Sequence, residues 1–291
     1  SRRPQMEMKW RSAMVLANLE LSGRGWRRSA SYDRLDPSEK SAVSYFLGMV
    51  QAKLTVGSVL RCSHMVHLDL VLKQAGLPLG KKRPDFLTLR AKRGRPGYNV
   101  VGVVEAKGRT NGFEPSTLVA AKKQAVLIPP LPHNAMTKSP MAVASVAYFD
   151  NDTDVWKSVL EDPVLDGEVI DTTAELSLIA YYRPVIEGLR DAWEVDGEEL
   201  SAPVEGTPYR ISIPKILVEA VDEARRDGYA GGEQFKETLS VLDYEQPGED
   251  FINVRQTPGE DWEFDEDRIR LLGEVDSAGA LPKVHEQGAV S

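Results

Sequence analysis

Two acidic residues and a lysine lie at the ends of two neighbouring apolar segments. Asp85 directly precedes the apolar segment 86–89, and Glu105 and Lys107 follow the apolar segment 100–104. Residues two positions apart in a strand share a face, so Glu105 and Lys107 are expected to leave the end of a sheet on one side. The pattern predicts that the two acids and the lysine meet at the end of a sheet.

The chemistry that suits such a group is metal-assisted hydrolysis. Two carboxylates in a partly buried place repel each other unless positive charge lies between them, and a hard divalent cation accepts oxygen ligands. The cation lowers the pKa of a bound water and neutralises charge on a phosphoryl oxygen, while a lysine orients the water or screens the growing charge. We therefore expect Mg²⁺ (or Mn²⁺) as cofactor and a phosphodiester as substrate.

The stretches Pro84-Asp85 and Glu105-Ala106-Lys107 resemble the motif of the PD-(D/E)xK nuclease superfamily, the restriction-endonuclease-like enzymes. The resemblance spans about residues 35–150. It implies an α/β fold with a mixed sheet flanked by helices, and metal-dependent cleavage of DNA, often in defence against foreign DNA. It also implies that Asp85, Glu105 and the Ala106 carbonyl hold the metal, with Lys107 positioning the water. Many members dimerise to cut both strands, which leaves a homodimer open.

Glu39 has two explanations. It is the only acid within the helix expected before the sheet, and in the family a glutamate on that helix often joins the metal site. Asp36 and Pro37 also make a helix start at which Glu39 falls at the third position, which is the pattern of a capping box. Helix capping alone explains a glutamate here, so the metal role of Glu39 is the less favoured of the two.

A hairpin is the element that would bring the main three residues together. Segments 84–89 and 98–106 read as strands, and the glycine- and proline-rich basic segment 90–97 reads as the turn between them. Antiparallel pairing then places Asp85 beside Glu105 and Lys107. A second acid-any-lysine triplet occurs at residues 7–9, but no Pro-Asp precedes it.

The helix expected at 115–126 carries candidate substrate contacts. Its segment 121–124 is Ala-Lys-Lys-Gln, which resembles the glutamine or basic residue that several branches of the family place near the active site. Lys122, Gln124 and, in the preceding loop, Arg109 could position phosphates. A solvated helix face explains the same residues equally well.

Histidines 64 and 67 with Asp69 raise a second metal hypothesis. Cys62 is the only thiol nearby, so a compact zinc site would need a fourth ligand that the sequence does not offer at a sensible spacing. A surface or core histidine pair is the favoured interpretation.

The other expected elements follow from apolar periodicity and turn residues. They are a helix at 6–20; a helix from residue 37 with Val43, Phe46, Leu47, Val50 and Leu54 inward; one or two strands, or a strand and a helix, at 56–72; a strand at 141–149; an acidic loop with a short helix at 150–167; a helix at 173–193 kinked or divided at Pro184; a strand at 209–213; and a helix at 214–227 with Ile216, Leu217, Ala220, Val221 and Ala224 inward.

Charge is distributed unevenly along the 291 residues. The net charge is −8, but residues 1–125 carry 23 Lys and Arg against 9 Asp and Glu, whereas residues 126–291 carry 13 against 35. A polyanion such as DNA would be drawn to the basic part. The acidic part could bind a basic protein partner or cover the site, and two differently solvated surfaces explain the asymmetry as well. A nuclease-fold binding or scaffold protein acting through the acidic part is thus the alternative function.

Three regions are expected: a nuclease-like core with an N-terminal helix at 1–150, a helical or mixed completion or cap at 151–244, and an acidic, partly disordered tail at 245–291. The single cysteine, Cys62, excludes an intramolecular disulfide. No apolar run of about 18 residues and no signal-peptide pattern are visible, so a cytoplasmic protein without membrane contact is expected.

Overall fold

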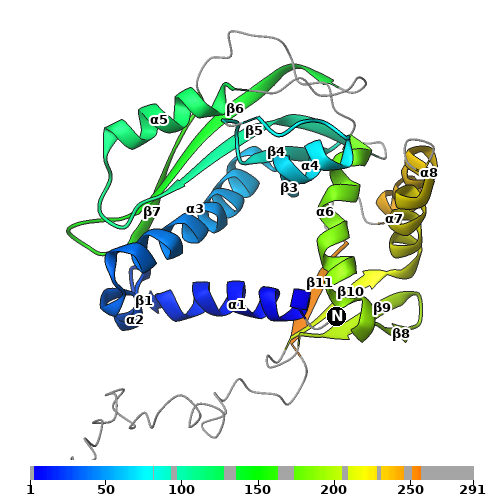
Figure 1. Ribbon diagram of the computed structural model, residues 1–291, viewed down its shortest axis with the longest axis horizontal. Helices are drawn as coiled ribbons and strands as arrows, with labels where there is room; N and C mark the ends of the chain where they lie inside the picture. The colour runs from blue at the N-terminus through cyan, green and yellow to red at the C-terminus, as the bar shows by residue number, and fades with distance from the viewer. Residues whose placement is uncertain are drawn as a thin grey trace, which may run out of the picture.

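A five-stranded mixed sheet forms the centre of the molecule (Figure 1). The computed structural model describes residues 3–80, 82–92, 97–127, 136–162, 174–204, 209–227, 231–245 and 251–256. The strand order is β3 (His64–His67), β4 (Phe86–Ala91), β5 (Tyr98–Gly108), β6 (Met136–Phe149) and β7 (Trp156–Glu161). Only β5 and β6 are parallel. The predicted mixed sheet flanked by helices and the predicted β4–β5 hairpin are therefore confirmed.

Helices cover both faces of this sheet. Helix α3 (Pro37–Leu60) packs on Val104, Ala106 and Val143, whereas α5 (Pro115–Ala125) packs on Ala144 and Val146. Because neighbouring residues of a strand point to opposite faces, Val143 and Ala144 show that the two helices lie on opposite sides. By length and composition alone α3 would pass as a membrane span, but it packs against a sheet as core helices do.

Helix α3 begins where the sequence predicts and lies directly on the end of β5. The Asp36 carboxylate accepts from the backbone of Glu39 while the Glu39 carboxylate accepts from the backbone of Asp36, so the capping box is confirmed. A Cβ added at Gly48 would lie 2.6 Å from the Gly108 amide nitrogen, and one at Gly108 would lie 1.6 Å from the Ser44 carbonyl oxygen. Glycine at both positions permits this close contact.

Two details of the expected apolar stripes are wrong. Leu54 of α3 is exposed, because the helix turns the row containing Met49, Ala52 and Val56 toward the sheet instead. Ile216 is also exposed, whereas the other four residues expected inward on that helix are buried.

The segment after β6 was expected to be an acidic loop with a short helix, and that expectation is wrong. Residues 156–161 form β7. Buried Trp156 pairs in register with Phe149 of β6, and both belong to the apolar cluster around Tyr32. Burying the indole against the sheet outweighs the acidic character of the neighbouring residues, since an aromatic side chain removes a large apolar area from water.

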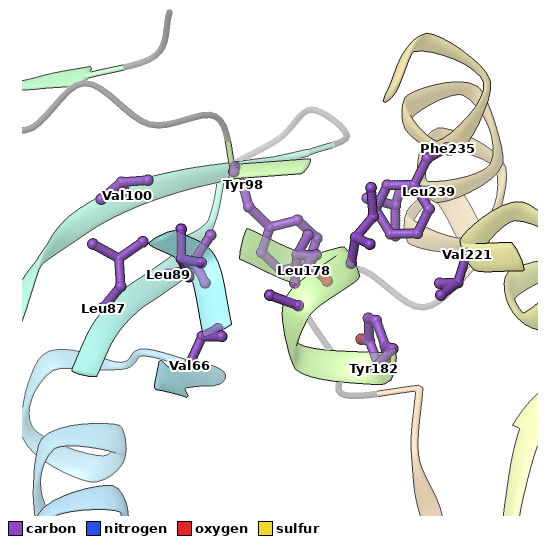
Figure 2. Close-up of a cluster of buried hydrophobic side chains, with 14 of the residues drawn as sticks. Val66, Leu87, Leu89, Tyr98, Val100, Leu178, Tyr182, Val221, Phe235 and Leu239 are labelled. Carbon is purple, nitrogen blue, oxygen red and sulfur yellow. The ribbon is translucent and has the colours of Figure 1, made fainter. Parts of the chain in front are cut away.

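A second sheet and three helices pack beside the first. This sheet has the order β11 (Asn253–Gln256), β10 (Tyr209–Pro214), β9 (Glu199–Pro203) and β8 (Glu194–Asp196). Helices α6 (Ala174–Leu189), α7 (Lys215–Asp227) and α8 (Gly231–Glu245) share an apolar core with β4 and β5 (Figure 2). Pro184 does not divide α6, which continues to Leu189 before the short 3-10 helix η1 (Arg190–Ala192).

The N-terminal part begins with helix α1 (Arg3–Asn18), and short strands and a short helix follow it. Helix α1 ends two residues before the predicted limit, since the hairpin of β1 (Leu19–Ser22) and β2 (Gly25–Arg28) follows at once. Helix α2 (Ala30–Arg34) leads into α3, which extends to Leu60.

Segment 56–72 was expected to be one or two strands, or a strand and a helix. From residue 64 onward the strand-and-helix alternative is confirmed, because α4 (Leu68–Gln74) follows β3.

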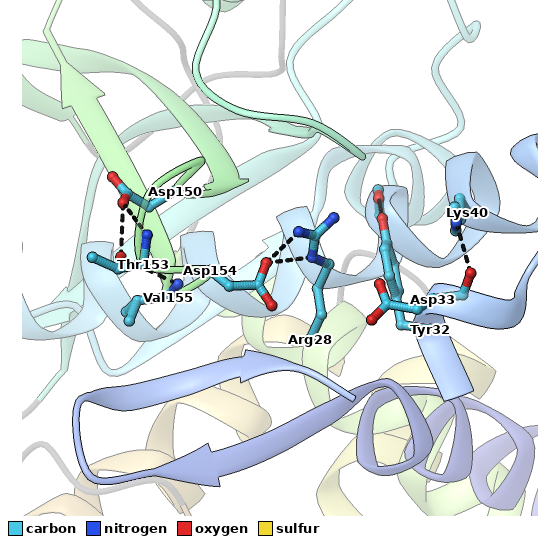
Figure 3. A network of polar contacts seen from close by, with 9 residues as sticks. Arg28, Tyr32, Asp33, Lys40, Asp150, Thr153, Asp154 and Val155 are labelled. Atoms are coloured by element: carbon cyan, nitrogen blue, oxygen red, sulfur yellow. Dashed lines mark hydrogen bonds and ion pairs between the residues drawn. The ribbon is translucent and has the colours of Figure 1, made fainter. Parts of the chain in front are cut away.

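A polar network fastens the β1–β2 hairpin to the turn between β6 and β7 (Figure 3). Arg28 forms an ion pair with Asp154. The Asp150 carboxylate accepts from the Thr153 amide at 3.0 Å and from its hydroxyl at 2.7 Å, which closes the turn. These contacts hold the chain that leads into α3, and α3 in turn lies against the predicted site.

The acidic segment from residue 257 onward lies outside the described residues, as do residues 93–96 of the basic turn and 163–173. The expected acidic tail therefore stays a prediction.

Candidate active site

The β4–β5 register places Asp85 beside Glu105. Phe86 pairs with Val104, so the next positions outward are Asp85 and Glu105. The Ala106 amide donates to Asp85 Oδ2 at 2.9 Å, and the charge of Asp85 helps to raise the pKa of the Glu105 carboxyl group, as expected for neighbouring acids. The two carboxylates predicted to meet do meet. Because the N–H and C=O of one strand residue point the same way, the Ala106 carbonyl also faces the Asp85 side.

Glu105 is in an unusual electrostatic state. Its side chain is 0% exposed, and burial first, then the charge of Asp85, raises its pKa to about 8. The Lys107 ammonium forms an ion pair with Glu105 Oε1 and opposes this shift. Apart from this ion pair, the Glu105 carboxylate has no hydrogen-bond partner, and its Oε2 atom is left without a donor. A buried carboxylate balanced by a single, partly exposed ammonium is costly, so this position favours a further cationic ligand.

Lys107 and Gln124 are connected on the α5 side of the sheet. Lys107 Nζ donates to Gln124 Oε1 at 3.3 Å, and Gln124 Nε2 donates to the Arg83 carbonyl at 2.8 Å. Gln124 thus links β5 to the segment just before Asp85. The side-chain amide orients the lysine toward the carboxylates, and about a third of the Lys107 side chain stays exposed to solvent.

A cleft of about 750 Å³ opens beside these residues. It is lined by Asp85, Pro84, Arg83 and Gln124 from the predicted site and by Glu7, Arg11, Tyr45, Phe46, Met49, His67, Asp69, Leu70, Pro184 and Val185. Burial, followed by the charges of Asp85 and Glu105, raises the pKa of Tyr45, which shows that the phenol lies in the field of both carboxylates. The site therefore opens into a cavity with a mixed aromatic and charged lining.

The remaining predicted residues have other contacts. Lys122 pairs with Glu161 at 2.5 Å, and Arg109 folds back on Glu114 at 2.6 Å and on the Thr117 hydroxyl at 2.7 Å. Glu39 is exposed and held in the capping box at the start of α3. The structure thus joins Asp85, Glu105, Lys107 and Gln124, with Ala106 contributing its backbone, and gives Lys122, Arg109 and Glu39 separate partners.

The two histidines of the zinc hypothesis point apart. His64 is fully buried and bonded to the Tyr182 hydroxyl at 2.8 Å, whereas His67, three residues along the strand, lines the cleft. His67 is accessible to solvent, yet the surrounding cleft walls desolvate its ring and lower its pKa. Within the described part of the chain, no three or more His, Cys, Asp or Glu side chains are grouped to hold a metal.

Sequence reasoning missed the cleft residues contributed by α1, α3 and α4. Asp69 forms an ion pair with Arg83, and Arg11 lies over the Phe46 ring with its Cζ 5.3 Å from the ring centroid. The one signal for these residues in the sequence was the adjacent aromatic pair Tyr45-Phe46, of which Phe46 belongs to the expected apolar stripe. Such a pair does not show whether its residues lie in a core or line a cleft.

No family model, no curated protein and no solved structure matches this chain.

Proposed function

We propose that the protein is a metal-dependent deoxyribonuclease of the PD-(D/E)xK type with a restriction-endonuclease-like core. The observation that supports this proposal most is the position of the fully buried Glu105 beside Asp85, with Glu105 Oε1 paired to Lys107 and Oε2 without a hydrogen-bond partner. A purely structural hairpin end would gain little from a carboxyl group buried beside a second acid, because burial and the neighbouring charge both disfavour its ionised form.

The residues present fit a magnesium-type ion. Asp85, Glu105 and the Ala106 carbonyl offer oxygen donors, and Mg²⁺ is usually held by one or two carboxylates while keeping several waters. Such an ion would gain most from binding Glu105 Oε2, which has no hydrogen-bond partner. When bound, the ion supplies a polarised phosphoryl group and an activated water.

The chain's own residues perform the remaining tasks. Lys107, oriented by Gln124, lies beside Glu105 and orients the attacking water or stabilises the negative charge that develops on the phosphate. Asp85 is held in place by the Ala106 amide, so its carboxylate is positioned before substrate arrives. The cleft beside these groups gives a substrate access to Asp85 and Gln124 in its lining.

The test is cleavage of single-stranded and double-stranded DNA in Mg²⁺ or Mn²⁺. Wild type is compared with the site variants Asp85→Asn and Lys107→Ala. The control is Asp222→Asn, on α7 outside the cleft, which removes a carboxylate from an ion pair with Arg190. We expect cutting that EDTA stops, that both site variants lose and that Asp222→Asn retains. Absent, EDTA-insensitive or equal cutting in the site variants would contradict the proposal.

The alternative is a nuclease-fold binding protein that acts through its acidic part, and the same preparations distinguish it. It predicts no cleavage with any substrate and a DNA affinity that changes when the chain is truncated after residue 256, which keeps β11 in place. An unchanged salt dependence of DNA binding in that truncation would remove the version in which the acidic part covers the site.

A further inference from the structure

We propose that the active-site cleft accepts an unpaired nucleic-acid strand and not an intact double helix, with Tyr45, Phe46 and Arg11 forming a nucleotide-binding subsite next to Asp85 and Glu105. This inference rests on the proposed nuclease function and adds to it the class of substrate.

The cleft is enclosed by helices on more than one side. Its lining comes from α1 and α3, from the β3–α4 segment, from Gln124 of α5, and from Pro184 and Val185 of α6. Helix α1 contacts both α3 and α6, so it extends across the space below the sheet in the view of Figure 1. A duplex lying on the end of the sheet would collide with α1, whereas a single strand can enter between the helices.

The size of the cleft agrees with a strand and disagrees with a duplex. Cavities of about 300–1,000 Å³ accommodate small ligands, and this one measures about 750 Å³. The major groove of B-DNA alone is about 12 Å wide and about 8.5 Å deep. The cleft can therefore hold a short piece of one strand, with the phosphate brought to Asp85 in its lining, but it cannot surround both strands.

Aromatic rings from α1 and α3 lie close together at the cleft. The Tyr45 and Phe46 ring centroids are 5.4 Å apart, and Trp10 of α1 packs edge-on against Phe46 at 5.6 Å. Tyr45 is 49% exposed and Trp10 is 56% exposed, although soluble proteins usually bury such rings. Exposed rings beside a cationic side chain are the lining on which unpaired bases stack, and paired bases do not present their faces for such stacking.

Arg11 supplies the positive charge for a phosphate. Its guanidinium lies over Phe46 and forms an ion pair with Glu7 at 2.6 Å, and both of these charged side chains are about half exposed. Exposed ion pairs of this kind contribute little stability. The Arg11 Nε and Nη2 atoms both donate to Glu7 Oε1, whereas a phosphate offers two oxygens and more charge, so it can replace Glu7 when a strand enters.

The first experiment measures substrate class with the full chain. A labelled single-stranded oligodeoxynucleotide, an RNA of the same sequence and a duplex closed at both ends by hairpin loops are compared for binding in Ca²⁺ and for cleavage in Mg²⁺. We expect the unpaired strands to bind at least about tenfold more tightly than the paired part of the closed duplex. Equal binding and equal cutting of the closed duplex within its paired region would overturn the inference.

The second experiment locates the subsite. Tyr45→Ala and Phe46→Ala should each weaken single-strand binding by about 5- to 100-fold, the effect typical of one stacked base, and Arg11→Gln should weaken it in a salt-dependent way. Trp26→Ala is the matched control, since Trp26 is 46% exposed on the β1–β2 hairpin outside the cleft. An equal loss in Trp26→Ala, or none in Tyr45→Ala and Arg11→Gln, would contradict the assignment.

The two proposals fail in different ways. Single-strand binding that depends on Tyr45 and Arg11 without any cleavage would contradict the nuclease function and support the subsite. Metal-dependent cleavage of the closed duplex that is insensitive to Tyr45→Ala would do the opposite.

Discussion

Two fully buried ionisable side chains lie at different ends of the same sheet, and their surroundings differ sharply. His64 on β3 is bonded at Nε2 to the Tyr182 hydroxyl at 2.8 Å and at Nδ1 to the Ser63 hydroxyl at 2.9 Å. The edges of three tyrosine rings surround it, those of Tyr98, Tyr181 and Tyr182. Glu105 on β5 has no hydrogen bond of normal geometry and lies against Lys107 and a second carboxylate.

Burial disfavours the charged form of both side chains, so it shifts their pKa values in opposite directions. Burial lowers the pKa of His64 to about 3, and burial with the charge of Asp85 raises that of Glu105 to about 8. The histidine stays neutral and its polar atoms are paired, as in an ordinary core. The ionised glutamate is balanced only by the partly exposed Lys107 ammonium, and burial together with Asp85 still outweighs that contact. The comparison teaches that hydrogen bonds compensate the burial of His64 in full, whereas the burial of Glu105 is compensated only in part. We propose that a metal ion supplies the rest at Glu105.

The largest expected difference between the two positions is in catalysis. Glu105→Gln keeps the size of the side chain but removes its charge, so we expect cleavage to fall by about 1,000-fold, comparable with the loss of a principal electrostatic contact in an active site. His64→Phe should leave the rate per folded molecule unchanged. Single-turnover cleavage with a folded fraction measured by circular dichroism checks both. Equal losses in the two variants would remove the distinction between a site residue and a core residue.

For the free energy of unfolding, the order of the two positions should be reversed, with the larger loss at His64. His64→Ala removes two hydrogen bonds and leaves a cavity among the tyrosine rings, so we expect the free energy of unfolding to fall by about 3 kcal/mol. Glu105→Gln, measured in EDTA, should keep or raise the free energy of unfolding, because burial and the charge of Asp85 together outweigh the ion pair with the partly exposed Lys107. Urea unfolding followed by tryptophan fluorescence measures both, and a large destabilisation by Glu105→Gln would contradict the interpretation of its surroundings.

The pH dependence of stability should have opposite slopes for the two groups. With the folded pKa of Glu105 at about 8 against 4.5 when unfolded, the folded state holds the extra proton, so this contribution is fully present below pH 4.5 and is lost as the pH rises through about 8. With the folded pKa of His64 at about 3 against 6.5 when unfolded, the unfolded state holds the extra proton. The contribution of His64 is therefore present above pH 6.5 and is lost as the pH falls toward 3.

Urea unfolding in EDTA across this pH range, for wild type, Glu105→Gln and His64→Phe, isolates the two slopes. Each variant should flatten the curve only in its own window, by about 2 kcal/mol or less after allowance for unfolded-state effects. A Glu105→Gln curve that parallels wild type from pH 4.5 to 8 would show that the carboxyl group is ionised in the folded protein without metal.

The smallest effect is expected at Glu39, which tests capping against metal binding. Gln can replace Glu in a capping box, so Glu39→Gln should change the free energy of unfolding by less than about 0.5 kcal/mol and leave cleavage unchanged. Asp36→Ala, which removes the N-cap, should cost about 1 kcal/mol. A loss of Mg²⁺-dependent cleavage in Glu39→Gln with unchanged stability would instead bring Glu39 into the metal site.

Local spacing was sufficient to predict much of the site. The hairpin followed from two apolar segments around a glycine- and proline-rich turn, and antiparallel pairing made the contact between Asp85 and Glu105 a consequence of register. The helix carrying Gln124 was predicted almost to the residue. The sequence could not choose among Lys122, Gln124 and Arg109, because each selects its partner from residues brought near by folding: Glu161, Lys107 and Glu114 respectively.

The sequence by itself determined the α/β character, the capping box at the start of α3 and the pairing that joins Asp85 to Glu105, because each depends on residues close in the chain or on the period of a strand. Only the tertiary structure decided that Glu105 is fully buried, that β7 completes the sheet, and that α1 and α6 turn the end of the sheet into a cleft with Tyr45 beside the carboxylates. These features depend on packing between segments far apart in sequence, and apolar periodicity shows that a helix has an inward face without showing what that face meets.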